Sequence, residues 1–272
     1  MPHKTLFGLV ALACIMASTA CSKLERLSII RPTAERGDYT RIAPDYDVSD
    51  KGRKGASLPT AKLLALALDS YQTGHAEQAR KQAQQVLKSD PASADAHTLL
   101  ALLDSNSGHN AAAGKHYAQA LAIAPGNGAY ANNYGSWLCG NGQPAESLAF
   151  FDAALADANY PTPVAALANA GSCAQQAGQP IRAETSWRQA LALDPESASA
   201  LSGMANLQFV RGQYMDARAF VQRWLAIAPQ DTNALQLAVQ IEQKQGDNAA
   251  AQRYLLRLQA IAPDASPVPP KQ

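Results

Sequence analysis

The side chains of this 272-residue chain that could do chemistry are few, and their spacing assembles no catalytic site. None of the five histidines forms a His-Glu-x-x-His pair or lies at zinc-ligand spacing from a cysteine. We expect these five to be ordinary surface residues: His3, His75, His97, His109 and His116. The carboxylates are scattered, and there is no Walker sequence or Gly-x-Ser-x-Gly turn. The sequence therefore predicts a protein that is not an enzyme and that needs no metal and no cofactor.

One glycine pattern imitates a nucleotide site. Gly126, Gly128 and Ala131 match the dinucleotide-binding spacing, but that motif follows a β-strand. Here an alanine-rich segment typical of a helix precedes it and ends at Pro125. We interpret the pattern as a turn between two helices.

Composition narrows the class of protein further. Apolar residues make up 47% of the chain and charged residues 17%, below the roughly 25% of an average soluble domain. There are 56 alanines against 17 aromatic residues, which favours closely packed helices over a β-sandwich. A formal net charge of +1 supplies no cationic face for nucleic acid.

The first twenty residues are typical of a secretory signal. Lys4 precedes an apolar run over residues 6–17, which is too short to span a bilayer. Small residues then precede Cys21, which resembles the lipobox of bacterial lipoproteins, where this cysteine is acylated and becomes the new N-terminus. Two or more acyl chains would give stable anchoring. The alternative is ordinary cleavage near Ala20, with Cys21 left as an unmodified thiol.

A repeat of 34 residues organises the rest of the chain. The glycines that mark it are Gly74, Gly108, Gly142, Gly178, Gly212 and Gly246. Five residues after each comes a small residue, namely Ala79, Ala113, Ser147, Ala183, Ala217 and Ala251. A proline closes five units, at Pro91, Pro125, Pro195, Pro229 and Pro263. The third unit is two residues longer and carries Pro161 and Pro163 instead.

Each unit reads as a pair of helices. The glycine lets the chain leave the first helix in a left-handed conformation, and the small residue lets the second helix cross the first closely. This pattern resembles the tetratricopeptide repeat from about Thr60 to Pro263. The expected fold is all-α, a right-handed superhelix of six helix pairs with a concave groove. Residues 1–20 would be the signal peptide, 21–59 the lipidated N-terminus and tether, 60–263 the repeats, and 264–272 a disordered proline-rich tail.

Two cysteines lie in the first helices of neighbouring units. Cys139 and Cys173 are 34 residues apart, and their positions within the repeat differ by two. Both can lie near one seam between the helices, and an exported protein meets an oxidising compartment, so we expect them to form a disulfide. The alternative is two packed thiols whose Cα atoms are more than about 7 Å apart.

The tetratricopeptide resemblance also implies where a partner binds, because the first helix of each unit lines the groove. The partner contacts that it implies are Leu64, Leu68, Tyr71, Leu102, Asn132 and Phe209. Ser136, Cys139, Asn206 and Val210 fall on the same face, and Lys244 is the only basic residue among these positions. A clamp for acidic C-termini needs several such residues, so the groove suits a strand or amphipathic helix. Alternatively, Leu64 and Leu68 pack beneath the tether or are ordinary surface leucines.

A closer resemblance is carried by the string Asn132, Asn133, Tyr134 and Gly135, followed by Trp137-Leu138-Cys139. With Asn169-Ala170-Gly171 and Cys173 one unit later, the chain is similar to the type IV pilus biogenesis and stability lipoproteins, the PilF/PilW pilotin family. The resemblance implies a monomeric adaptor, lipid-anchored in the outer membrane and facing the periplasm. It would bind the pilus secretin and promote its multimer assembly. Without this resemblance, a generic periplasmic scaffold for outer-membrane protein assembly or peptidoglycan synthesis fits equally well.

Overall fold

The computed structural model describes residues 58–261, and these form twelve α-helices and no strand. The first helices of the six units are α2 (Thr60–Gln72), α4 (Ala94–Asn106), α6 (Gly128–Gly140), α8 (Pro163–Gln176), α10 (Ala198–Val210) and α12 (Thr232–Gln245). The second helices are α3 (Ala76–Ser89), α5 (Asn110–Ile123), α7 (Pro144–Ala156), α9 (Pro180–Leu193), α11 (Tyr214–Ile227) and α13 (Asn248–Ile261). The predicted all-α solenoid of six helix pairs is confirmed.

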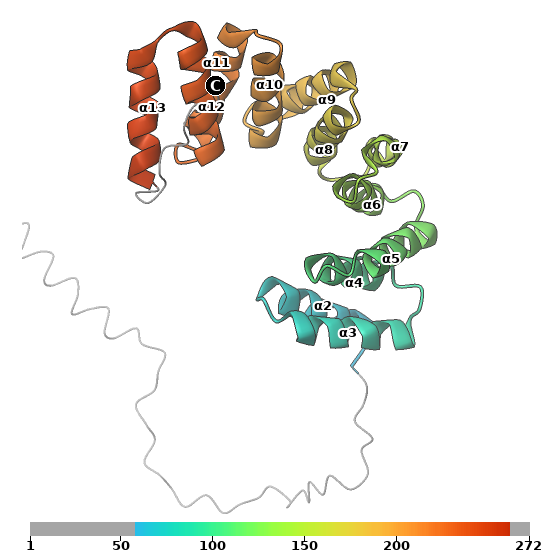
Figure 1. Cartoon of the computed structure of the whole chain (residues 1–272). Coiled ribbons are helices and arrows are strands. Elements are labelled where there is room, and N and C mark those ends of the chain that lie inside the picture. Colours follow the sequence, from blue (N-terminus) through green and yellow to red (C-terminus); the bar gives the residue numbers. More distant parts are fainter. Residues whose placement is uncertain (1–57, 262–272) are drawn as a thin grey trace, which may run out of the picture. The chain divides into compact units, whose positions relative to one another are not determined.

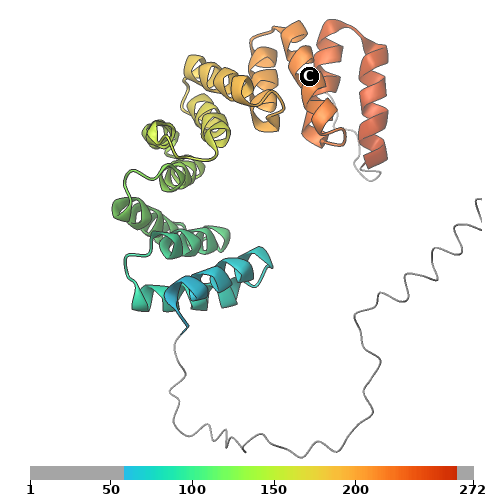
Figure 2. The same ribbon diagram turned by 180° about the vertical axis from the view of Figure 1, so that it is seen from behind.

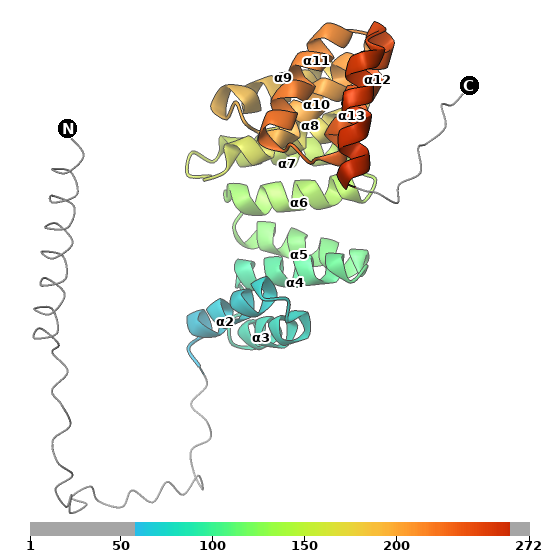
Figure 3. The same ribbon diagram turned by 90° about the vertical axis from the view of Figure 1, so that its left-hand side faces the viewer.

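The pairs stack in chain order within residues 58–261. Each second helix packs on the first helix of its own unit and, in units one to five, on the first helix of the next. The stack is curved, with α4, α6 and α8 on its inner side and α5, α7 and α9 on its outer side (Figures 1 and 2). Figure 3 shows the same succession from the side, from α2 and α3 to α12 and α13. None of the described helices is long and apolar enough to cross a membrane.

The signal peptide, Cys21, the tether and the proline-rich tail lie outside the described residues, and those predictions stay predictions.

The repeated glycine ends the first helix of every unit. All six glycines have φ between 72° and 84°, a left-handed conformation that costs other residues energy. In unit three the N–H of Gln143 then donates to the carbonyl of Leu138 at 2.9 Å, beyond the glycine at position 142. This bond satisfies a carbonyl that the helix end would otherwise leave unpaired.

The small residue five positions later is the crossing point of each pair. Its side chain is fully buried in four of the five units where it is alanine and nearly so in the fifth, and Ser147 is also fully buried. One turn further along the second helix, Tyr117, Phe151 and Trp187 point inward and are at most 5% exposed. The second helices of units two to four therefore bury one aromatic ring each at the same repeat position.

Glycines make room for the aromatic rings in the middle of the stack. A Cβ added to Gly171 on α8 or to Gly203 on α10 would overlap the indole of Trp187, so this ring fills the space between the two helices. In the same way, a Cβ on Gly114 would overlap the ring of Trp137. Ring and glycine are therefore complementary, and neither can change alone without loss of packing.

The two extra residues of unit three are accommodated in its closing turn. The Asp157 carboxylate accepts hydrogen bonds from the N–H groups of Gly128 at 2.8 Å and Asn159 at 2.9 Å. These bonds, that to Gly128 first, lower the pKa of Asp157. Tyr160 is 8% exposed and packs against Ala131, which closes the gap left by the longer turn.

Replacing Gly142 with alanine should lower the free energy of unfolding by about 1 kcal/mol, because alanine is strained at φ 84°. Gly126 is the matched control, since neither glycine has an atom within 4 Å of an added Cβ and only Gly142 has a positive φ. The urea midpoint should fall for Gly142→Ala and stay or rise for Gly126→Ala. Equal midpoints for the two variants would contradict this account of the turn.

Candidate functional site

The concave face begins at α2, where three of the predicted contacts lie. The Leu68 side chain is 39% exposed, whereas Leu64 and Tyr71 are half-buried. The Tyr71 hydroxyl accepts a hydrogen bond from Nδ2 of Asn106 at 3.3 Å, which ties unit one to unit two. Leu66 is 36% exposed, but it is two residues from Leu64 and Leu68 and therefore lies on another side of α2. Leu68 is therefore the residue of the predicted three with the most free apolar surface.

Two other predicted contacts have a clear packing role. Leu102 is half-buried and packs against the buried cluster of Ala101, Ala113 and Tyr117. Phe209 is half-buried, and its ring centroid lies 5.6 Å from that of Tyr214. Both residues can offer a partner only one edge of the side chain.

An amide cluster lies in the middle of the groove. Nδ2 of Asn169 on α8 donates to Oδ1 of Asn132 at 3.1 Å and to Oγ of Ser136 at 3.2 Å, both on α6. Sequence reasoning did not assign Asn169 to the groove. The repeat phase did not reveal it, because Asn169 occupies the repeat position of Asn133, one residue after the groove residue Asn132.

Tyr134 and Gly135 of the four-residue motif are structural. The Tyr134 ring stacks on the ring of Trp137, with 5.9 Å between the ring centroids. It packs edge-on against Phe150, with 4.8 Å between the centroids. A Cβ on Gly135 would lie 3.2 Å from Phe151, so the glycine sets the spacing between α6 and α7. Asn132 is the motif residue that joins the amide cluster.

Cys139 and Cys173 form a disulfide that joins α6 to α8. Their Cα atoms are 5.8 Å apart, within the usual range for this bond. Both are at most 6% exposed and belong to the largest buried cluster, together with Leu148 and Phe151. The bond fixes the two helices that carry the amide cluster.

Charged side chains gather mainly on the second helices, where several are paired. Arg182 donates to both carboxylate oxygens of Asp152, at 2.8 and 2.7 Å. Glu184 bonds Arg211 and Arg188, which lower its pKa in that order. The pairs Arg182–Asp152 and Arg211–Glu184 link neighbouring units, whereas Arg188–Glu184 lies within α9, and each contributes little stability.

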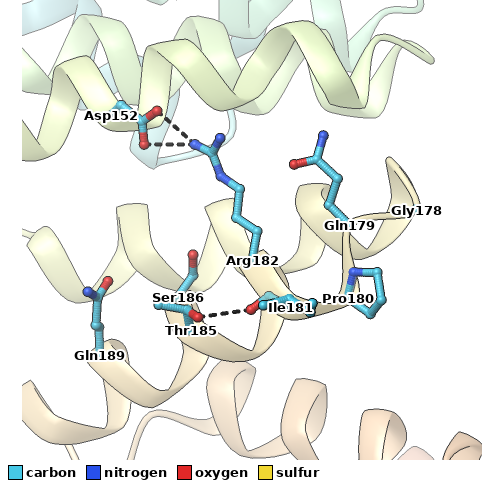
Figure 4. Close-up of a pocket in the computed structure, with 9 residues that line it drawn as sticks. All are labelled: Asp152, Gly178, Gln179, Pro180, Ile181, Arg182, Thr185, Ser186 and Gln189. Atoms are coloured by element: carbon cyan, nitrogen blue, oxygen red, sulfur yellow. Dashed lines mark hydrogen bonds and ion pairs between the residues drawn. The ribbon is translucent and has the colours of Figure 1, made fainter.

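The Arg182–Asp152 pair borders a hollow of about 680 Å³ at the start of α9 (Figure 4). Ile181 lines it and is 78% exposed, while Gln179, Thr185 and Gln189 supply neutral polar groups. Because the carboxylate already neutralises the guanidinium, this hollow offers a neighbouring molecule no net charge.

A second hollow, of about 240 Å³, opens between α8 and α10. Trp187 and Leu207 line it but are at most 4% exposed, whereas Val210, also in its lining, is 77% exposed. Its polar lining is formed by Ser172, Gln175, Ser202 and Asn206. All four are uncharged, so this hollow can bind peptide groups and small apolar side chains.

The expectation that all histidines are surface residues is wrong for His97 and His116. Their Nδ1 atoms are 2.9 Å apart across the α4–α5 contact, and both rings are half-buried. Nε2 of His116 lies 4.0 Å from Asp104, which is 5% exposed and pairs with Arg80 at 2.6 Å. Burial, followed by the neighbouring His97, lowers the pKa of His116, and Asp104 opposes this. His75 and His109 are exposed as predicted.

Within residues 58–261, no group of three or more histidine, cysteine, aspartate or glutamate side chains is arranged to hold a metal ion.

Comparison with known proteins identifies the repeats and their relatives. Family models described as "Tetratricopeptide repeat" match residues 64–127 and 174–241. The type IV pilus assembly protein PilF of Pseudomonas aeruginosa is 30% identical over 161 residues, which are 59% of this chain and 63% of PilF. The match thus spans less than two thirds of that relative.

Solved structures extend the likeness to the full set of repeats. The crystal structure of PilW, described as a widely conserved type IV pilus biogenesis factor, is 33% identical with a TM-score of 0.72. That alignment covers 76% of this chain and 94% of PilW. The structure of P. aeruginosa PilF is 27% identical with a TM-score of 0.69, covering 76% of this chain and 93% of PilF. A tetratricopeptide repeat protein from Parabacteroides merdae, 20% identical with a TM-score of 0.60, shares the fold.

Loss of the disulfide should destabilise the repeats. A loop of 34 residues predicts roughly 3–4 kcal/mol from the chain entropy of the unfolded state. The variant Cys139→Ser/Cys173→Ser should unfold at lower urea than the oxidised protein and close to the reduced wild type. Peptide mapping without reductant supplies the control, because two alkylatable thiols in the exported protein would rule the bond out.

Stability should also fall below about pH 6.5, the ordinary pKa of histidine, through His116. The folded protein holds this proton less tightly than the unfolded chain, so the contribution is complete above that pH and declines as the pH falls. The urea midpoint of His116→Gln should change less than that of the wild type between pH 7.5 and 5.5. In His97→Gln, the His116 pKa, followed by NMR, should rise. Identical pH dependence in His116→Gln and the wild type would contradict this assignment.

Proposed function

Since the chain belongs to the tetratricopeptide-repeat proteins and is homologous to the type IV pilus proteins PilW and PilF, we propose that it is an assembly adaptor of a type IV pilus. In this proposal it is a pilotin: it binds the pilus secretin and promotes the localisation and multimer assembly of the secretin in the outer membrane. The observation that carries the proposal is the 33% identity to PilW over 94% of that structure.

Contact with the secretin is proposed to begin on α2. Leu68 exposes 39% of its surface, and Leu58, just before the helix, exposes 45%. Burying such leucines against a partner removes apolar surface from water, which favours association. An amphipathic helix or a strand with alternating apolar residues presents the matching surface.

The adaptor is proposed to act from the outer membrane, facing the periplasm and attached through acyl chains on Cys21. An anchored adaptor raises the effective concentration of a captured subunit at the membrane without any new contact. The proposal requires neither catalysis nor a cofactor, and it has the protein act as a monomer that binds through its groove.

The test is the amount of heat-resistant secretin multimer in outer-membrane fractions of cells with and without the protein. Multimers should be lost, and secretin monomer should remain, when the protein is absent. Cells that lack the protein and express the Leu68→Ser variant should form fewer multimers than cells that express the wild type. The reason is that the serine removes an apolar contact from the groove. Leu193→Ser is the matched control, since Leu193 is 60% exposed at the end of a second helix.

Unchanged multimers in cells without the protein would refute the proposal. Full recovery by folded Leu68→Ser would move the contact away from α2.

A further inference from the structure

Three consecutive helices of the concave face carry no charge. The helices α6, α8 and α10, of 13, 14 and 13 residues, contain no aspartate, glutamate, lysine, arginine or histidine. At the chain's charged fraction of 17%, segments of this length would be expected to carry several such residues. The first helices nearer the ends of the stack do carry them, for example Lys62 on α2, Asp95 on α4 and Lys244 on α12.

Burial does not account for this difference. Gln175 and Asn206 are exposed, and Ser172 and Ser202 are half-buried. Exposed helix positions usually accept lysine and glutamate without cost, as Lys244 shows on α12. Neutral side chains at positions open to water therefore need a reason other than packing.

The hollow between α8 and α10 supplies a place where such neutrality matters. The Trp187 indole lies between Gly171 and Gly203, where an added side chain would overlap it. Only 3% of the surface of Trp187 is exposed, so the ring forms a buried wall of the hollow, whose volume of about 240 Å³ can take an aliphatic side chain. Val210, 77% exposed, extends the apolar surface outward.

The polar lining of the hollow is suited to a peptide backbone. Nδ2 of Asn206 donates to the carbonyl of Ser202 at 2.8 Å, and its Oδ1 has no partner among the described residues. The Gln175 amide likewise has no hydrogen-bond partner within residues 58–261, so it can both donate and accept. An extended segment offers unpaired N–H and C=O groups to match them. If the bound segment carried a charged side chain here, that charge would be removed from water without a counter-charge in the hollow. This removal costs free energy.

We infer that the charge-free groove of α6, α8 and α10 binds an uncharged, extended segment of the partner protein, with an aliphatic side chain seated against Trp187. Gln175 and Asn206 bond the peptide groups of the segment. This rests on the proposed function in one respect, that the partner is a protein. It adds the chemistry of the bound segment and a second contact separate from the leucines of α2.

The inference is tested by introducing a negative and a positive charge at the same groove position and comparing how each changes the binding affinity. Asn206→Asp and Asn206→Lys should each weaken binding of the purified periplasmic region of the secretin by about tenfold or more, because either charge would be desolvated in the complex. Calorimetry measures the affinity, and circular dichroism establishes that both variants fold. Ala219→Asp and Ala219→Lys are the matched controls, at an exposed position of the second helix of the same unit, and should bind like the wild type.

Opposite effects of aspartate and lysine at position 206 would overturn the inference, because they would show that the bound segment is charged. Wild-type affinity in both Asn206 variants would also overturn it, by placing the contact elsewhere.

Failure of the wild-type protein to bind the secretin would refute the proposed function but not the inference about the groove. A second experiment then tests the groove without the secretin. A display library of short random peptides is selected on the full-length protein. Enriched peptides should share an uncharged run with an aliphatic residue, and both Asn206 variants, but neither Ala219 variant, should lose them. Enriched peptides with a charged consensus, or peptides that both Asn206 variants retain, would overturn the inference.

Discussion

The close crossing of two helices at one small side chain is the contact on which the whole repeat structure depends. Ala79, Ala113, Ser147, Ala183 and Ala217 are fully buried at this crossing, and a larger side chain there would force the pair apart. The left-handed glycine five residues earlier aims the second helix at that point. A single pair still exposes one apolar face, so each unit is stable only against its neighbours. The concave surface follows from this stacking.

The middle of the stack is more constrained than its ends. The Trp187 ring between Gly171 and Gly203 and the disulfide between α6 and α8 both restrict the first helices of units three to five. The ion pair Arg182–Asp152 links the second helices α7 and α9, and Arg211–Glu184 links α9 to the C-terminal end of α10. Packing and covalent bonding thus hold the inner helices, while charge lies among the outer ones. The groove can therefore stay neutral without loss of solubility or of contact between units.

The repeat predicts the fold well because the same glycine and small-residue pattern occurs in all six units. It predicts the site less well because the residues of a binding surface do not repeat from unit to unit. Helix α8 begins at Pro163, one of the two prolines that unit three carries in place of a closing proline. The expectation of an exposed His97 was wrong, although the repeat indicates a packed side chain there. The same repeat position is occupied by Ala131, Leu201 and Leu235, which are at most 1% exposed. Leu102 and Phe209 were predicted from phase alone, and phase does not reveal how much of a side chain the neighbouring unit covers.

The backbone is nearly the same in every unit, so differences between units at one groove position reflect something other than folding. The ninth position of the first helix shows this most directly: it is occupied in turn by Leu68, Leu102, Ser136, Ser172, Asn206 and Gln240. The chemistry passes from aliphatic to hydroxyl to amide along the stack. A groove that bound one uniform helix would have no need of this gradient. A single partner chain that buries an apolar stretch at units one and two and continues as a neutral, extended segment across units three to five accounts for it, and it explains why charge returns only on α12, beyond that path.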